Sequence, residues 1–188
     1  NKTGYWGPVI YDSSNYQVNH DTVNGAYNYK EYPPFYALRE NYRVAVVDVP
    51  VSALSEDIKG LQILGWGGHA PHTPSHSLPT EALPEIIKQY GKNPVLHQDY
   101  GCWWDKAYSD RIKKGLRVST STRAKICRDI LKQENWDLFI TVFAETHSAG
   151  HDFWHLSQAD HPLYPYKREA SDHMLQAFQD VDRAIGEI

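Results

Sequence analysis

The sequence predicts an α/β fold with a mostly parallel sheet flanked by helices. Two nearly unbroken apolar runs rich in β-branched residues, 44–49 and 138–143, are typical of strands that are buried on both faces. Between them, the apolar residues of 119–136 recur at helical spacing. A strand, a helix and a second strand in this order are the pattern of a parallel sheet whose connections cross over through helices.

The remaining elements follow from shorter patterns of the same kind. They predict a strand at 61–66 and further helices at 80–90, 103–114 and 171–188. Thr80 is the expected N-cap of the first of these helices, and Gly91 is expected to end it. The last helix has its apolar residues at spacings of four, three and four: Met174, Phe178, Val181 and Ile185.

Hydroxyl and charged residues set the expected limits and faces of the helix within 119–136. Ser121 or Thr122 is the expected N-cap, because short hydroxyl side chains accept hydrogen bonds from the first free N–H groups of a helix. Arg123 is expected on the solvent face, opposite an apolar stripe that includes Cys127.

Length and composition bound the organisation of the chain. Its 188 residues, 41% of them hydrophobic, suffice for a real core, so we expect 1–188 to be a single α/β domain or a fragment of a larger catalytic domain. Residues 1–34, rich in Tyr, Asn, Asp and Gly, are expected to be an irregular wrapping segment. The absent initiator Met and a last helical pattern that runs to Ile188 without a stop signal favour the central part of a longer protein.

Charge and hydropathy argue against two classes of partner. A net charge of −4 provides no basic field for phosphate backbones, so no nucleic-acid polymer is expected. No apolar run approaches the roughly 20 residues that span a bilayer, so no membrane span is expected. The two cysteines have neither the number nor the spacing of a disulfide framework or a zinc knuckle.

A histidine-rich stretch, FAETHSAGHDFWHLSQADHP at 143–162, directly follows the second predicted central strand. The carboxyl end of a parallel strand is where open α/β sheets place their ligands. His147 and His151 are four residues apart, so a helical turn would direct both at one point, and His155 would extend the row. Two imidazoles, a carboxylate and a water would satisfy a tetrahedral zinc. The alternative is a solvated loop whose imidazoles cap backbone carbonyls.

Residues 136–155, WDLFITVFAETHSAGHDFWH, resemble the middle of the alkaline phosphatase superfamily, in its type I phosphodiesterase/nucleotide pyrophosphatase branch. In that branch an Asp, two spacers and a Gly-His follow a central strand, and the Asp and the His bind one of two zinc ions. Gly150 and His151 match the Gly-His, whereas His147 stands in place of the Asp. The Asp-His-Gly motif of the family is missing, because Asp160-His161 is followed by Pro162.

The resemblance implies a partial alkaline phosphatase-like core and a role in a metal-dependent hydrolase. The expected substrates of the intact parent are small phosphate mono- or diesters, or related sulfate or phosphonate esters, hydrolysed with two divalent metals, most simply zinc. His151 and His147 are the expected metal ligands, and three further side chains are expected to orient those ligands or to face the substrate: Glu145, His155 and His161. The nucleophile of the family would precede residue 1, so no catalytic residue is assigned and the fragment itself is expected to be inactive.

A second hypothesis is a non-catalytic module that binds a ligand or partner through His-rich and aromatic loops. The replaced Asp and the missing motif favour it. Its candidate contacts are the loop histidines His69, His72 and His76 and a set of aromatic residues for which core or loop packing is the competing explanation: Trp66, Tyr100, Trp103, Trp104 and Trp154. Asp48, at the end of the first central strand, would either face the site or cap a turn.

Overall fold

The computed structural model describes seven ranges of the chain, namely residues 9–12, 14–20, 33–50, 52–68, 75–96, 105–163 and 172–188. The chain packs as two compact units, one formed by Asn1–Ile87 with Asn135–Val142 and the other by Lys88–Glu134 with Phe143–Ile188. The organisation of 1–188 as one domain and the wrapping role of 1–34 stay predictions. Within 1–34, two short strands, β1 (Val9–Asp12) and β2 (Gln17–His20), pair antiparallel.

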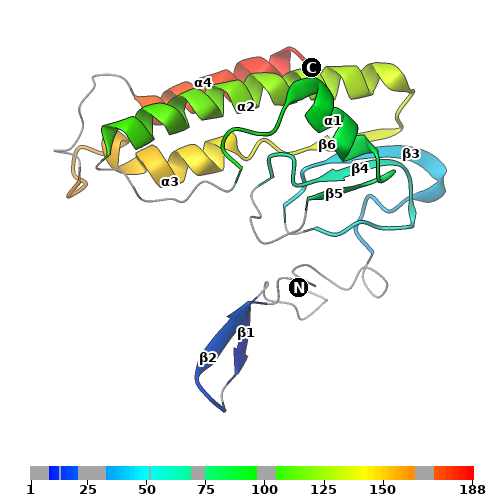
Figure 1. Cartoon of the computed structure of the whole chain (residues 1–188), viewed down its shortest axis with the longest axis horizontal. Coiled ribbons are helices and arrows are strands. Elements are labelled where there is room, and N and C mark those ends of the chain that lie inside the picture. The colour runs from blue at the N-terminus through cyan, green and yellow to red at the C-terminus, as the bar shows by residue number, and fades with distance from the viewer. Residues whose placement is uncertain are drawn as a thin grey trace. The chain divides into compact units, whose positions relative to one another are not determined.

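The first unit contains a four-stranded, mostly parallel sheet. Its strands lie in the order β5 (His76–Leu78), β4 (Ile58–Leu64), β3 (Arg39–Val47) and β6 (Leu138–Thr141). Both neighbours of β3 run parallel to it, and β5 pairs antiparallel with β4 (Figure 1). The carboxyl ends of β3, β4 and β6 therefore lie at one edge of the sheet. The predicted α/β class and mostly parallel sheet are confirmed.

Strand β3 is the most buried part of this sheet. Its residues Val44 to Val47 are at most 1% exposed, and Tyr36 and Ile58 pack in the same apolar cluster. Burial on both faces explains why the run is continuously apolar rather than alternating. The strand predicted from this run is confirmed, and hydrogen bonding extends it back to Arg39.

Asp48 directly follows β3 and lies at the carboxyl edge of the sheet. It has a left-handed backbone conformation, with φ of 56°, and is 1% exposed. Its Oδ1 accepts a hydrogen bond of 2.9 Å from the backbone N–H of Trp66, and its Oδ2 accepts one of 2.8 Å from that of Gly67. The buried carboxylate is thus satisfied by the turn that follows β4, which agrees with the turn-capping alternative for this residue.

In the described part of the second unit three helices pack together, and they lie side by side in Figure 1: α2 (Lys106–Gln133), α3 (Glu145–Ser157) and α4 (His173–Gly186). Their shared core contains Ile112, Leu116, Ala149, Phe153 and Ala177. None of the helices in the described ranges is long and apolar enough to cross a membrane.

The predicted amphipathic stripe of α4 is buried only in part. Val181 is 8% exposed, but Phe178 and Ile185 are 50% and 58% exposed, and the small residues Ala177 and Ala184 take their place in the interior. The helix as such is confirmed, with Asp172 as its N-cap.

The expected division of α2 into two helices is wrong. The helix runs unbroken over 28 residues from its N-cap Asp105, whose Oδ1 accepts from Ala107 N–H at 2.9 Å. Ser121 lies mid-helix and its hydroxyl donates to the Val118 carbonyl at 3.1 Å. Hydroxyl residues in this stretch therefore bond to other segments of the chain or to the preceding turn of the same helix, instead of capping the start of a new helix.

The expected cap of α1 (Ala82–Tyr90) is also wrong. The helix begins at Ala82, two residues after Thr80, and it is the hydroxyl of Ser77 that accepts from Leu83 N–H at 2.9 Å. Gly91 follows the last helical residue with φ of 85°, as expected for a glycine that ends a helix.

Replacing Gly60 by Ala is expected to destabilise the first unit. Gly60 has φ of 139° inside β4, where an added Cβ would collide with the Val44 carbonyl oxygen and lie 2.9 Å from Trp136 Cζ3. Gly91→Ala is the matched control, because Gly91 also has a positive φ but nothing lies within 4 Å of its added Cβ. Urea denaturation should show Gly60→Ala costing at least about 2 kcal/mol more than Gly91→Ala; equal losses would contradict the steric account.

Candidate functional site

Helix α3 brings the first two predicted ligands together. It begins at Glu145 and continues through Gly150 without a break. One turn of helix therefore separates His147 from His151, and their Nε2 atoms lie 2.9 Å apart with ring centroids at 4.5 Å. Spacing alone predicted this convergence, which requires a regular helix at a position where Gly is an unfavourable residue.

Both imidazoles of this pair lie on the exposed side of α3. Partial desolvation, followed by repulsion from His151, lowers the pKa of His147 below its ordinary value of 6.5. The ring of His147 therefore stays neutral to a lower pH than an isolated histidine. A neutral ring keeps the lone pair that a metal ligand needs.

The pair fits two of the four positions around a tetrahedral zinc. Two nitrogens bound at 2.0–2.1 Å with a tetrahedral angle lie about 3.3 Å from each other, so the observed 2.9 Å would have to open by about 0.4 Å. Among the residues that the structure describes, no group of three or more His, Cys, Asp or Glu side chains converges. The described residues thus bring together two imidazoles, fewer than the four ligands of a tetrahedral zinc.

The other two predicted histidines form a separate pair. His155 is only 6% exposed, and its ring lies 6.0 Å from that of His161, centroid to centroid. Burial, followed by repulsion from His161, lowers the pKa of His155. The nitrogen Nδ1 of His161 accepts from Leu163 N–H at 3.1 Å, which fixes the orientation of this ring.

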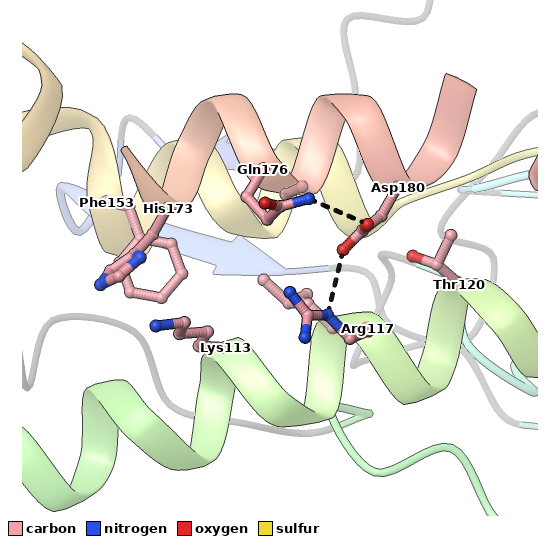
Figure 2. A pocket seen from close by; sticks show the side chains of 9 residues that line it. Lys113, Arg117, Thr120, Phe153, His173, Gln176 and Asp180 are labelled. Atoms are coloured by element: carbon pink, nitrogen blue, oxygen red, sulfur yellow. Dashed lines mark hydrogen bonds and ion pairs between the residues drawn. The ribbon is translucent and has the colours of Figure 1, made fainter. Parts of the chain in front are cut away.

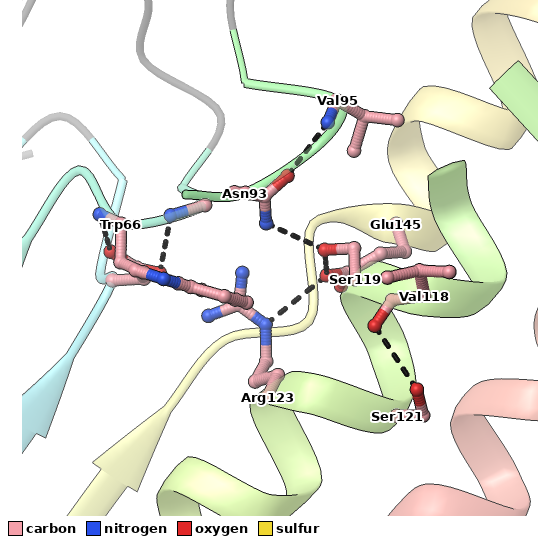
Figure 3. Close-up of polar contacts among 10 residues, drawn as sticks. Trp66, Asn93, Val95, Val118, Ser119, Ser121, Arg123 and Glu145 are labelled. Atoms are coloured by element: carbon pink, nitrogen blue, oxygen red, sulfur yellow. Dashed lines mark hydrogen bonds and ion pairs between the residues drawn. The ribbon is translucent and has the colours of Figure 1, made fainter. Parts of the chain in front are cut away.

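Glu145 lies in the interior, bonded to α2. Its Oε1 accepts hydrogen bonds from Ser119 Oγ at 2.5 Å and from Arg123 Nε at 3.3 Å (Figure 3). The carboxylate is 2% exposed, and its Oε2 has no hydrogen-bond partner in the described part of the chain. The hydrogen bonds that Glu145 accepts in the structure therefore come from side chains of α2.

The expectation that Arg123 faces solvent is wrong, since Arg123 is 0% exposed. Its guanidinium forms the ion pair with Glu145 and lies 5.7 Å from the ring centroid of Phe143. A signal was present in the sequence: Arg123 precedes Ile126, Cys127 and Ile130 by three, four and seven residues, the spacing of one helix face.

The hollow between α2 and α4 is too small for a substrate. Its volume of 10 Å³ leaves room for about one water molecule at most. Figure 2 shows Asp180 beside it, accepting from Gln176 at 3.1 Å and paired with Arg117 at 3.4 Å. None of the five predicted site residues lines this hollow.

The residues proposed for a binding loop are described only in part. His69, His72, Tyr100, Trp103 and Trp104 lie outside the described residues. Of the others, His76 begins β5, Trp66 is 2% exposed and Trp154 is 51% exposed. Packing therefore accounts for Trp66, whereas Trp154 presents its ring to solvent.

Acid is expected to destabilise the chain in part through His155. The folded state holds the pKa of His155 below the unfolded value of 6.5, so this stabilisation is present above about pH 6.5 and is lost as the pH falls through the folded pKa. Urea denaturation at about pH 7 and about pH 5 should show a smaller acid-induced loss for His155→Gln than for the wild type. Parallel pH profiles would contradict the assignment.

Comparison with known proteins identifies the family of the chain. The model of the type I phosphodiesterase / nucleotide pyrophosphatase family matches residues 4–188. No curated protein and no solved structure matches the chain. Members of the family act on small phosphoesters and are in general metal-dependent. Because the match spans nearly the whole sequence, the chain belongs to the type I phosphodiesterase / nucleotide pyrophosphatase family of hydrolases.

Proposed function

We propose that this chain supplies two ligands, His147 and His151, to the metal site of a hydrolase that cleaves small phosphate mono- or diesters or the related sulfate or phosphonate esters. The observation that carries the proposal is the 2.9 Å separation of the two Nε2 atoms on the exposed side of α3. Zinc is the metal that such a pair of imidazoles suits best among common hydrolytic ions.

The chemistry that bound metals supply in such sites is polarisation of a phosphoryl oxygen and a lowered pKa of the attacking hydroxyl. The role of this chain is to present ligands in a fixed geometry. His147 and His151 each donate one neutral nitrogen from consecutive turns of one helix, so their spacing is fixed by the backbone. His155, in the last turn of the same helix, and His161, four residues beyond its end, orient the ligand segment or face the substrate.

The isolated 188-residue chain is proposed to be inactive. The residues that the structure describes contribute two metal ligands and no larger cluster of ligating side chains. A site of this class needs further ligands and a nucleophile, which a complete catalytic centre must draw from outside the described residues.

Replacing His151 by Ala is expected to weaken zinc binding at least tenfold, because it removes a direct ligand. Calorimetric titration with zinc and elemental analysis would measure the effect in the full-length protein and in this chain, beside the variant His147→Ala/His151→Ala. His76→Ala is the matched control, because His76 lies on β5, away in sequence from the pair. Its zinc binding should equal that of the wild type.

The competing function is a non-catalytic binding module, which the exposure of Trp154, three residues after His151 on the same helix, favours. The same titration distinguishes the two when it is followed by hydrolysis assays of chromogenic phosphate mono- and diesters in the full-length protein. Zinc binding that depends on the pair, together with hydrolysis, supports the enzyme. Titrations that are identical for the wild type and the double variant remove His147 and His151 from any metal site.

A further inference from the structure

A buried polar cluster connects α2 to the first residue of α3. Asn93 Nδ2 donates to Ser119 Oγ at 2.6 Å, and Ser119 Oγ donates to Glu145 Oε1 at 2.5 Å. The amide NH₂ of Asn93 can only donate, so Ser119 Oγ is the acceptor in this bond. The single hydroxyl proton of Ser119 is therefore left to donate to Glu145. Arg123 adds a charge-assisted bond to the same oxygen (Figure 3).

Stability alone does not explain an ion pair in this position. The side chains of Arg123 and Glu145 are 0% and 2% exposed, so both charges have lost their hydration. Apolar side chains of similar volume stabilise a protein as well as, or better than, such a pair. A buried pair of this kind is therefore a candidate for fixing one particular arrangement of the two helices that it connects, α2 and α3.

Helix α3 begins without an N-cap of its own. Ala144 precedes it with helical dihedral angles, φ −78° and ψ −6°, and has no side-chain oxygen to accept a hydrogen bond. The first turn is closed by the bond of Ser148 N–H to the Ala144 carbonyl, at 3.0 Å. This turn contains His147, and Gly150 weakens the turn that follows.

A second contact with α2 lies just beyond the histidine pair. Tyr108 donates its hydroxyl proton to Asp152 Oδ1 at 3.0 Å, within the interior. Tyr108 and Ser119 are eleven residues, or three turns, apart and lie on one side of α2. The segment of α3 that bears His147 and His151 is thus held to α2 at both of its ends, at Glu145 and at Asp152.

We propose that Ser119 and Arg123 are positioning residues for the His147–His151 pair: by binding the carboxylate of Glu145 they hold the first residue of α3 against α2, and so keep helical a first turn that has no side-chain N-cap. His147 then stays one turn from His151, with both rings directed to the same point. The importance of this geometry for metal binding rests on the function proposed above, whereas the ordering of the first turn does not.

The test is the variant Arg123→Met/Glu145→Met, which removes both charges together and leaves neither buried alone. Hydrogen exchange of the Ser148 amide in the metal-free chain should accelerate at least tenfold, because the first turn opens more often. Zinc affinity should fall by roughly tenfold or more, as for other residues that orient ligands. The amide of Phe153, further along α3, should keep its protection.

The matched control is Arg128→Met/Glu187→Met. These residues form an ion pair of 2.9 Å between α2 and the end of α4, with side chains 28% and 52% exposed. The control should leave both the exchange of Ser148 and the zinc affinity unchanged. If Arg123→Met/Glu145→Met fails to fold, Ser119→Ala removes one bond to Glu145 without a charge and should change both quantities in the same direction.

Unchanged exchange of the Ser148 amide in a folded variant would overturn the positioning role. A fall in zinc affinity without faster Ser148 exchange would overturn it too, because the effect would then be one of charge. If Ser148 exchange accelerates but the wild type binds no zinc, the metal function fails and the positioning role stands. The two proposals therefore fail on different measurements.

Discussion

Parallel pairing on both sides of β3 is the constraint on which the sheet depends. Residues Val44 to Val47 bond to β4 on one side and to β6 on the other. Parallel neighbours cannot be joined by a tight turn, so the chain needs long connections between them. The connection from β4 to β6 contains β5, α1 and α2, and the bond of Val142 N–H to the Val47 carbonyl brings the chain out of β6 at the carboxyl edge. Three residues later α3 begins.

Two buried carboxylates follow the parallel strands, and each is stabilised by a different kind of donor. Asp48, directly after β3, accepts from two backbone N–H groups. Glu145, four residues after β6, accepts from the side chains of Ser119 and Arg123. Backbone donors hold a turn whatever the neighbouring side chains are, whereas the contacts of Glu145 depend on two particular residues of α2.

The parts of the fold that could be predicted from the sequence are those that a local pattern of residues determines. The run at β3 is apolar because both faces of the strand are buried, and the pairing of His147 with His151 follows from helical spacing. The similar run at β6 was predicted to be a central strand buried on both faces, which is wrong: β6 is the outer strand of the four-stranded sheet, and its residues are only partly buried. The continuity of α2 was missed because its hydroxyl residues have two uses, capping and tertiary bonding, that spacing does not separate. The burial of Arg123 depends on Glu145, 22 residues away, so a local pattern could not supply its partner.

The close approach of His147 and His151 constrains the tautomers of their two rings. Two neutral imidazoles with Nε2 atoms 2.9 Å apart are hydrogen-bonded when one carries its proton on Nε2 and the other presents a lone pair. The two rings are then different tautomers, although they lie on the same helix. A metal ion that took both Nε2 lone pairs would require this proton on Nδ1 of the same ring, so binding of the ion and the change of tautomer would be a single equilibrium in which no net proton is released.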